Sequence, residues 1–528
     1  MTKFLAVCFM VALVVGVGGC KVPTEPAPGM DDGFLTIKDR QFYDAAGRNV
    51  ILRGVNIGFR HGPRGDRPAP WPHGGAEDFA KIRAWGYNCV RLVIFWSAVE
   101  PVCGQYDEAF LKEVDERIGW AKANDLRVII DMHQDLWGQG VPNGRGAPEW
   151  ALLDPTRPHA KGTMVWSEAY FTSPLVKSAF DNFWNNTPGP DGVGIQDHFA
   201  RAWQAVAKRY AEEPAVIGYD LFNEPSLGSP IQSVMLGMTV KMVPRLVARG
   251  AKLDLKNEAA LAREAMKFAR SDMALYREWL SAAAGKVAAM DAKYVAPMYA
   301  RVAKAIREVD TRHFLLTSPT LTANIGVQNG IPPLPDKDGH PDSLHVFAPH
   351  AYDDSTERID LIFGRLAESA ERLKTPLFLG EWGNLTNSDR IFQADPVPAA
   401  QAVARLLDAA RASDTYWYFK ADLDAQPYFK SVLQRPYPMA VAGTLAEYRF
   451  DTGSATFTCT WREDPDVSVP TLIYVPEVWY GGGYVCELVP REEGAKFYPI
   501  SLGTGNGCLV VAPSGHDIDR TLVLRPKS

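Results

Sequence analysis

The sequence lacks several features that would place it in common classes of protein. Lys and Arg total 56 against 62 Asp and Glu, a net charge of −6, so we expect no nucleic-acid partner. Beyond the amino terminus, no apolar run is long enough for a membrane-spanning helix. There is no Cys-x-x-Cys motif, no His-rich cluster and no solenoid-type repeat, so we predict neither a metal site nor a cofactor.

What is present is typical of a large globular protein. Hydrophobic residues make up 46% and charged residues 22% of 528 residues, enough for one large domain and a smaller one. Fourteen tryptophans and nineteen tyrosines are many. Aromatic rings suit sugar binding, although most such side chains fill cores.

The pattern of residues 1–20 predicts a targeting segment at the amino terminus. A positive start at Met1–Lys3 precedes an apolar stretch, Phe4–Val17, that is too short to remain as a membrane span. Val17-Gly18-Gly19-Cys20 resembles a bacterial lipobox, in which Cys20 becomes the lipidated first residue. We therefore expect an exported bacterial protein, either a membrane-anchored lipoprotein or a secreted one. Residues 21–33, with several Pro and Gly, are predicted to be a tether.

Five cysteines remain beyond the leader: Cys89, Cys103, Cys459, Cys486 and Cys508. An odd number in an exported protein leaves at least one thiol unpaired, and the pairing of the others stays open. Cys89 lies in an apolar run and is expected to be a buried small hydrophobic residue.

Short apolar runs alternate with helical patterns along most of the chain. The expected strands are Val50–Ile57, Asn88–Trp96, Arg127–Asp135, Ile217–Glu224, His313–Pro319, Leu344–Tyr352, Leu377–Gly383 and Asp414–Lys420. Runs this apolar are typical of a buried parallel sheet. Eight strand–helix periods predict an α/β fold, a (β/α)8 TIM barrel over residues 34–446, with a short hairpin at 34–44 capping its floor. Residues 447–528 alternate short strands with glycine turns and predict a small antiparallel β-sandwich.

A helical insert is expected at about residues 226–310. Its first part, Val234–Val243, is apolar and rich in methionine. One interpretation is an extended fourth barrel helix whose methionines face the core. The other is a hydrophobic rim beside the active site, with Val234, Met235 and Met238 bordering a lipid substrate.

Two expected strands end on glutamate. The first of these strands is expected to end at Glu224, because the next residue, Pro225, donates no ladder hydrogen bond. A second apolar run ends on Glu381. In an α/β barrel the carboxyl ends of the strands form the catalytic rim. Two carboxyl groups about 5–5.5 Å apart are what retaining glycoside hydrolysis requires. We predict that Glu224 is the general acid and base and that Glu381 is the nucleophile.

Other strand ends deliver further polar and aromatic side chains to the same rim. They are Arg91, His133, Asp135, Asn223, His350, Tyr352 and Trp417. Asn223-Glu224-Pro225, His350-x-Tyr352, Gly380-Glu381 and Trp417 together resemble glycoside hydrolase family 5, a family of retaining (β/α)8 enzymes.

The reaction suggests roles for these residues. Arg91 is expected to hold Glu381 ionised, or simply to form a salt bridge inside the barrel. Tyr352 is expected to hydrogen-bond Glu381, and Asn223 the sugar 2-hydroxyl. His133 and His350 would orient these groups or bind sugar hydroxyls. Trp417 would be a stacking floor for the sugar, with core packing as the alternative.

A narrower resemblance rests on four further segments. Asp131–Asp135, Gly146–Trp150, Phe183-Trp184 and Arg435–Gly443 resemble endoglycoceramidases and their glucosylceramidase-like relatives, and the likeness runs from Ile51 to Gly443. The resemblance implies cleavage of the bond between glycan and ceramide. It also implies that Asp135 contacts sugar hydroxyls and that Trp184 lines the same pocket. Arg60 is the nearest candidate for a sugar-contacting lysine of such relatives.

This resemblance implies a glycosphingolipid substrate, with no cofactor. A lipid anchor and an apolar rim would bring a monomeric enzyme to the membrane surface. A cellulase- or mannanase-like polysaccharide endoglycosidase, with the same catalytic residues, is the competing enzyme. A lipoprotein that binds glycans without turnover is the third possibility.

Overall fold

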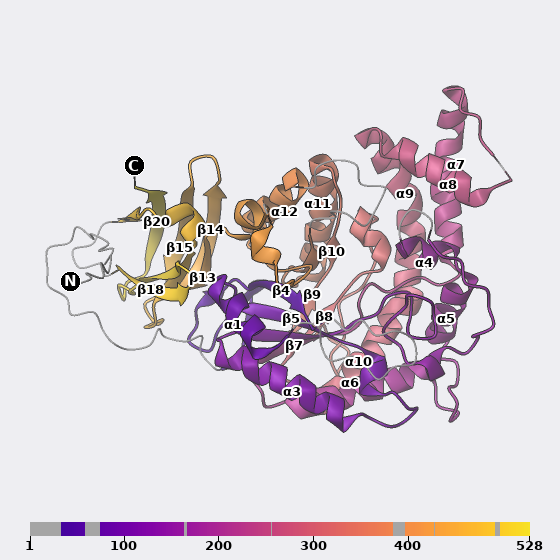
Figure 1. Cartoon of the computed structure of the whole chain (residues 1–528), viewed down its shortest axis with the longest axis horizontal. Helices are drawn as coiled ribbons and strands as arrows, with labels where there is room; N and C mark the ends of the chain where they lie inside the picture. The colour runs from indigo at the N-terminus through magenta and orange to yellow at the C-terminus, as the bar shows by residue number, and fades with distance from the viewer. Residues whose placement is uncertain are drawn as a thin grey trace, which may run out of the picture.

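A parallel β-barrel forms the centre of the protein (Figure 1). The structure, a computed structural model, describes residues 33–58, 74–162, 166–254, 256–383, 397–426, 428–490 and 497–527. The barrel strands are β4 (Arg53–Ile57), β5 (Cys89–Ile94), β6 (Arg127–Met132), β7 (Val216–Asp220), β8 (Phe314–Thr317), β9 (His345–Phe347), β10 (His350–Ala351), β11 (Phe378–Trp382) and β12 (Ser413–Tyr416). β12 pairs with β4 and closes the ring.

The segments β9 and β10 are two halves of one strand. They are separated by Ala348 and Pro349, and proline has no N–H to donate to a ladder. β9 pairs with β8, and β10 pairs with β11. The nine segments therefore occupy eight strand positions, and the predicted (β/α)8 barrel is confirmed.

Several barrel strands are shorter than expected. Asn49–Val50 forms β3 of another sheet, so the first barrel strand begins only at Arg53. β7 ends at Asp220, so the expected strand as far as Glu224 is too long. Glu224 instead lies in the turn after β7, with a backbone φ of 42°.

Helices cover the outside of the barrel (Figure 1). They are α1 (Ala76–Ala84), α3 (Glu108–Ala123), α6 (Ile195–Tyr210), α10 (Ala296–Arg307), α11 (Thr356–Leu373) and α12 (Val397–Ala410). The α11 helix shows why they form: Ser355 caps its first turn by accepting from the Arg358 N–H, and its apolar face is buried. Between β12 and β13 (Tyr437–Val441) the described chain forms only the short helical turns η5 (Leu423–Ala425) and η6 (Phe429–Leu433).

The long excursion after β6 folds into short helices over one side of the barrel mouth. They are η1 (Glu149–Ala151), η2 (Trp166–Glu168), α4 (Ala169–Thr172) and α5 (Pro174–Trp184). α5 starts with Pro174 after the capping residue Ser173, a favourable helix start because the first-turn N–H groups have no helical partner.

The insert after β7 is helical, as expected. It consists of α7 (Ile231–Ala248), α8 (Glu258–Ala269) and α9 (Met273–Met290), and a π-helical turn, η3 (Asp291–Val295), leads into α10. The α7 and α8 helices project from the barrel at the upper right of Figure 1.

The apolar side chains of α7 point in two directions. Val234 and Met238 are 0% and 1% exposed, in a core shared with α8 and α9. The prediction that Val234, Met235 and Met238 border a lipid is therefore wrong for Val234 and Met238, because helix packing inside the insert buries them, while Met235 is only partly buried. Leu236, Val240 and Val247 are instead 58%, 54% and 59% exposed.

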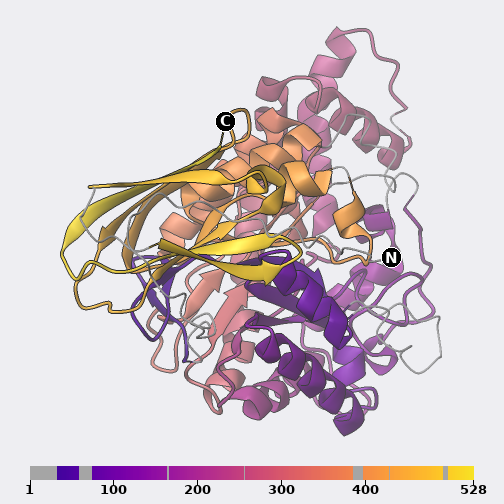
Figure 2. The ribbon, with the colours of Figure 1, turned by 60° about the vertical axis from the view of Figure 1, so that its left-hand side comes forward.

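The carboxyl-terminal part forms two antiparallel sheets (Figure 2). One has the order β1-β2-β3-β13-β16-β19-β18 and the other β14-β15-β20-β17. Their strands are β1 (Thr36–Lys38), β2 (Gln41–Tyr43), β3 (Asn49–Val50), β13 (Tyr437–Val441), β14 (Gly443–Asp451), β15 (Thr456–Glu463), β16 (Thr471–Val475), β17 (Tyr484–Val489), β18 (Phe497–Gly503), β19 (Asn506–Val511) and β20 (Ile518–Pro526). The boundary expected after Ala446 falls inside β14.

The amino-terminal hairpin belongs to this sandwich and also contacts the barrel. β3 pairs with β13, and the ring of Phe42 on β2 lies 5.2 Å from that of Phe314 at the start of β8. One apolar cluster contains Leu35, Phe42 and residues at the amino ends of the barrel strands. The hairpin thus connects the barrel floor to the sandwich.

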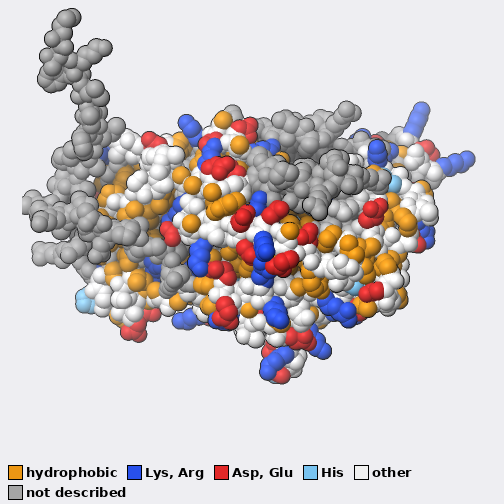
Figure 3. All heavy atoms as spheres, turned by 60° about the horizontal axis from the view of Figure 1, so that its bottom comes forward, with side chains coloured by type: hydrophobic (Ala, Val, Ile, Leu, Met, Phe, Trp, Pro, Cys, Tyr) orange, Lys and Arg blue, Asp and Glu red, His pale blue; other side chains and the backbone are white. Residues whose placement is uncertain are grey.

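On the face of the molecule in Figure 3, acidic and basic side chains are interspersed with apolar ones. No helix among the described residues has both the length and the apolarity to cross a membrane. The five cysteines of the described chain are all free thiols, and Cys89 is buried in β5.

Candidate active site

Glu224 and Glu381 meet at the carboxyl end of the barrel. Glu381 lies on β11, and Glu224 follows β7 across the ring. A carboxylate oxygen of each lies within 4.8 Å of the other. This separation is near that of retaining glycosidases and well below the 6.5–9.5 Å or so of inverting ones. The Glu224 side chain is 14% exposed, whereas that of Glu381 is 5% exposed.

Glu381 is held by groups on both of its oxygens. Nη1 of Arg91 donates to Oε1 at 2.9 Å, and the Tyr352 hydroxyl donates to Oε2 at 3.0 Å. Burial raises the pKa of Glu381 above its ordinary value, and this effect outweighs the opposing charges of His350 and Arg91. The contacts fix which oxygen lone pairs remain available to a substrate.

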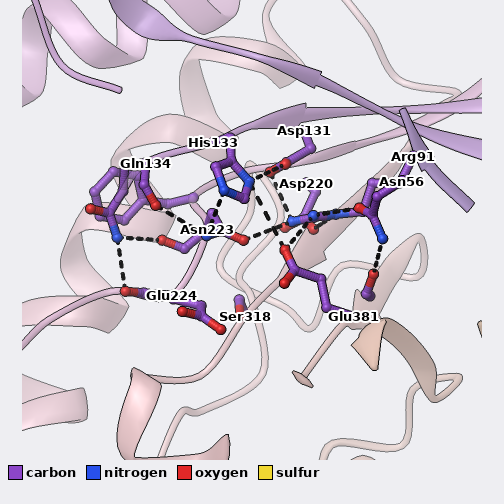
Figure 4. A network of polar contacts seen from close by, with 12 residues as sticks. Asn56, Arg91, Asp131, His133, Gln134, Asp220, Asn223, Glu224, Ser318 and Glu381 are labelled. Carbon is purple, nitrogen blue, oxygen red and sulfur yellow. Dashed lines mark hydrogen bonds and ion pairs between the residues drawn. The ribbon is translucent and has the colours of Figure 1, made fainter. Parts of the chain in front are cut away.

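Arg91 is the centre of a fully buried polar network (Figure 4). Besides Glu381 it contacts Asp131 at 2.9 Å, Asp220 at 2.8 Å, Asn56 at 2.9 Å and Asn223 at 3.0 Å. Burial lowers the pKa of Arg91, but the three carboxylates outweigh it and the pKa is raised. The guanidinium therefore stays charged, and its planar fork fixes residues from several strands.

Sequence reasoning did not assign Asp131, Asp220 or Asn56 to this network. The available signal was a charged residue inside an apolar strand, as for Asp220 in β7. A buried charge is expected to have a partner.

His133 lies under Trp417. The two rings stack at 5.3 Å with planes 10° apart. Nδ1 of His133 is 2.8 Å from Asp131 and Nε2 is 3.5 Å from Asp135. Burial lowers the pKa of His133, but the two aspartates have the larger effect and raise this pKa to about 10. A charged imidazolium thus supports the face of Trp417, whose ring is partly exposed.

The turn that carries Glu224 is held by amide side chains. Nε2 of Gln134 donates to the carbonyl oxygens of Asn223 and Glu224 at 2.8 and 3.0 Å. Nδ2 of Asn223 donates back to the Gln134 carbonyl at 3.1 Å. Asn324 donates to Oε1 of Glu224 at 2.6 Å. A left-handed backbone at a non-glycine residue such as Glu224 persists only where its surroundings enforce it.

Neither Gln134 nor Asn324 was singled out in advance. Gln134 lies inside a motif used for the resemblance, whereas Asn324 comes from the short helical turn η4 (Leu321–Ile325), for which the sequence offers no signal.

His350 lies between the two glutamates. Its Nδ1 is 2.8 Å from Oε1 of Glu224 and 3.6 Å from Oε2 of Glu381. Burial lowers the pKa of His350, while Glu381 and then Glu224 raise it, and the net direction is upward. Glu224, His350 and Glu381 have the spacing of metal ligands, but Arg91, Tyr352 and Asn324 already occupy their carboxylates.

The other predicted residues lie nearby. Asp135 is buried and pairs with Arg145 at 2.9 Å. Trp184 is only 8% exposed, and its Nε1 donates to the Ser226 carbonyl at 3.0 Å, so it supports the segment just after Glu224. Arg60 and Cys20 lie outside the described residues.

The site has an acid partly open to solvent, an oriented buried carboxylate and a stacking aromatic ring, all at the carboxyl end of a (β/α)8 barrel. This combination defines a glycoside hydrolase of the retaining class.

Comparison with known proteins gives the family. The cellulase (glycosyl hydrolase family 5) domain matches residues 43–422, and the glycoside hydrolase family 5 C-terminal domain matches residues 435–502. The chain therefore belongs to glycoside hydrolase family 5.

Similar proteins span nearly the whole chain. Endoglycoceramidase I of Rhodococcus hoagii (strain 103S) is 25% identical over 501 residues, which cover 89% of this chain and 85% of that protein. The structure of endo-glycoceramidase II from Rhodococcus sp. has a TM-score of 0.67 at 27% identity, covering 94% of this chain and 100% of the other. The same enzyme in a ganglioside GM3 complex gives a TM-score of 0.67 at 26% identity, covering 93% and 100%.

Proposed function

We propose that this glycoside hydrolase cleaves the β-glycosidic bond between glycan and ceramide in glycosphingolipids. The observation that carries the proposal is the Glu224–Glu381 pair, set in a chain that resembles endoglycoceramidases along almost its full length. The ganglioside GM3 complex of a relative supports the substrate class.

Two displacements complete the reaction. In the first, Glu381 attacks the anomeric carbon while Glu224 gives its proton to the departing ceramide oxygen, so the glycan becomes covalently bound to Glu381. In the second, Glu224 takes a proton from the attacking water, and the glycan leaves with its anomeric configuration retained. Arg91 and Tyr352 hold both oxygens of Glu381 during the attack.

The neighbouring groups position the sugar. The Nδ2 group of Asn223 is proposed to donate to the 2-hydroxyl, a contact that strengthens in the transition state. The partly exposed ring of Trp417 is proposed to stack on the sugar face, held in place by His133.

The lipid part of the substrate and its membrane are proposed to contact α7. This helix begins at Ile231, soon after Glu224, and presents Leu236, Val240 and Val247 to solvent. Three apolar side chains on one exposed surface favour a lipid contact. We also propose that the protein is an exported monomer anchored through a lipid on Cys20, with free secretion as the alternative.

The test is product analysis on ganglioside GM3, lactosylceramide, glucosylceramide, galactosylceramide and cellodextrins. We expect intact oligosaccharide and ceramide from ganglioside GM3, with the β-anomer formed first in an NMR time course. Glu381→Gln serves as the inactive control. Faster hydrolysis of cellodextrin than of any glycolipid would overturn the proposal in favour of a polysaccharide glycosidase.

A further inference from the structure

Three potential metal ligands, none of them a catalytic residue, meet beside the start of α6. Cys103 lies in the turn that follows α2 (Trp96–Val99), Asp191 lies in the loop before α6, and His198 lies in the first turns of α6. Sγ of Cys103, a carboxylate oxygen of Asp191 and a ring nitrogen of His198 all lie within 4.8 Å of one another. Asp191 and His198 are near each other along the chain, whereas Cys103 comes from a distant segment that the fold brings to them.

His198 is oriented by a buried carboxylate. Its Nδ1 is 2.8 Å from Oε1 of Glu100, which is 0% exposed. The other oxygen of Glu100 accepts from Nε1 of Trp96 at 2.8 Å, and Oε1 also accepts from the Gly104 N–H at 2.8 Å. Glu100 therefore fixes both the imidazole and the turn that carries Cys103. A carboxylate on the far nitrogen of a histidine is the usual support for a zinc ligand.

The distances fit a small tetrahedral ion. Sγ of Cys103 is 3.5 Å from Nε2 of His198, and Nε2 is 3.0 Å from Oδ1 of Asp191. With ordinary zinc bond lengths, sulfur and nitrogen ligands lie about 3.6 Å apart and nitrogen and oxygen ligands about 3.4 Å apart. Asp191 is exposed and can move outward by the few tenths of an ångström required.

We propose that Cys103, Asp191 and His198 bind one Zn²⁺ ion, with the fourth position taken by water. Thiolate, imidazole and carboxylate are the ligand types that zinc prefers. Two anionic ligands neutralise the charge of the ion. The ring of Trp150 contacts His198 edge-on at 4.9 Å and forms an apolar wall beside the site.

The ion would connect the turn after α2 to the start of α6. At present the hydrogen bonds of His198 make this connection. A bound metal adds its binding free energy to folding, so Zn²⁺ should raise the temperature of thermal unfolding.

The test uses the full chain, treated with chelator and dialysed, and titrated with Zn²⁺ alone in a calorimeter. We expect one Zn²⁺ per chain, with about 10–100-fold weaker binding in Cys103→Ser, Asp191→Asn and Glu100→Gln. Cys486→Ser is the matched control, since this partly buried thiol lies on β17; it should bind Zn²⁺ like the wild type.

Cobalt gives an independent readout. Co²⁺ bound at this site should show a thiolate charge-transfer absorption that is absent in Cys103→Ser and present in Cys486→Ser. Circular dichroism would establish that each variant is folded, and the exposed position of Asp191 makes Asp191→Asn the safest of them. Sub-stoichiometric binding in the wild type, or equal affinity in wild type and Asp191→Asn, would overturn the proposal.

Discussion

Nδ1 of His350 lies 2.8 Å from Oε1 of Glu224. The same nitrogen is 3.6 Å from Oε2 of Glu381, so one imidazole contacts both glutamates. The two carboxylates raise the pKa of His350 against the effect of burial. The protonated ring in turn lowers the pKa of Glu381, which burial alone would raise further.

His350→Gln should shift the acidic limb of the pH–activity profile to higher pH. The nucleophile must be ionised, and removing a positive neighbour raises the pKa of Glu381, so activity appears only at higher pH. The measurement is the pH dependence of kcat/KM, whose acidic limb should move to higher pH. His340→Gln, at an exposed histidine, is the control. An unchanged acidic limb in His350→Gln would rule out this coupling.

The first step of Glu224→Gln should be restored on substrates with an acidic leaving group, whereas that of Glu381→Gln should not. Loss of the proton donor is expected to lower kcat on a glycolipid by about 10²–10⁴. Aryl glycosides with acidic phenols need no proton in the first step, so Glu224→Gln should accumulate the glycosyl-enzyme with them. Mass spectrometry of the intact protein would detect this adduct. Equal loss on both substrates in Glu224→Gln would contradict its assignment as the acid.

Arg91→Lys keeps the charge but cannot keep the contacts. Lysine has three donors at one point, while Arg91 contacts five side chains from a planar fork. We expect kcat to fall by roughly 10–100-fold, because Glu381 loses its orientation. KM should change little, because the contacts to the sugar remain. Arg525→Lys, at a half-exposed arginine on β20, is the control. A change in KM alone would argue against this role.

His133 should make the stability of the protein depend on pH above neutrality. Its pKa is about 10 in the folded protein and about 6.5 when unfolded. Its contribution is therefore complete below about pH 6.5 and lost as pH rises through about 10. The difference in unfolding free energy between wild type and His133→Gln, measured in urea, should shrink from pH 6 to pH 10.

His345→Gln is the matched control for this measurement. His345 is also buried, but burial lowers its pKa to about 4. It is neutral in both states above about pH 8, so its difference from wild type should stay constant from pH 8 to pH 10, where the difference for His133→Gln still shrinks. A constant difference for His133→Gln as well would contradict its charged state.

Replacing Leu236, Val240 and Val247 together with Ser should weaken hydrolysis of glycolipid in vesicles. Losing three exposed apolar side chains reduces membrane contact, and we expect roughly a tenfold rise in apparent KM. Cleavage of a soluble aryl glycoside should be unchanged. Serine at Val485 and Val489, which are exposed on the sandwich, is the matched control. Equal activity on vesicles in both variants would exclude α7 as the membrane contact.

Much of the barrel could be predicted because a buried parallel strand requires a short, nearly continuous apolar run. Glu224 and Glu381 could be found because each directly follows such a run. The exact end of β7 could not be predicted, since the left-handed turn at Glu224 depends on Gln134 from the loop after the neighbouring strand β6.

Features that depend on contacts between distant segments were not predictable. Asp131 and Asp220 pair with Arg91 only once β5, β6 and β7 lie side by side in the sheet. The α7 helix is apolar on opposite sides, so the sequence does not say whether Met238 or Val240 faces inward. In the structure α9 packs against the side of α7 that carries Met238, so Met238 faces inward.

The pairing of β3 with β13 has a consequence for synthesis on the ribosome. The backbone N–H and C=O groups on the β13 side of β3 have no partner until the chain has been extended past Val441. Any nascent chain stalled before that point exposes an open hairpin and an uncovered barrel floor, both prone to aggregation. Carboxyl-terminal truncations of this protein should therefore be found in inclusion bodies or bound to chaperones.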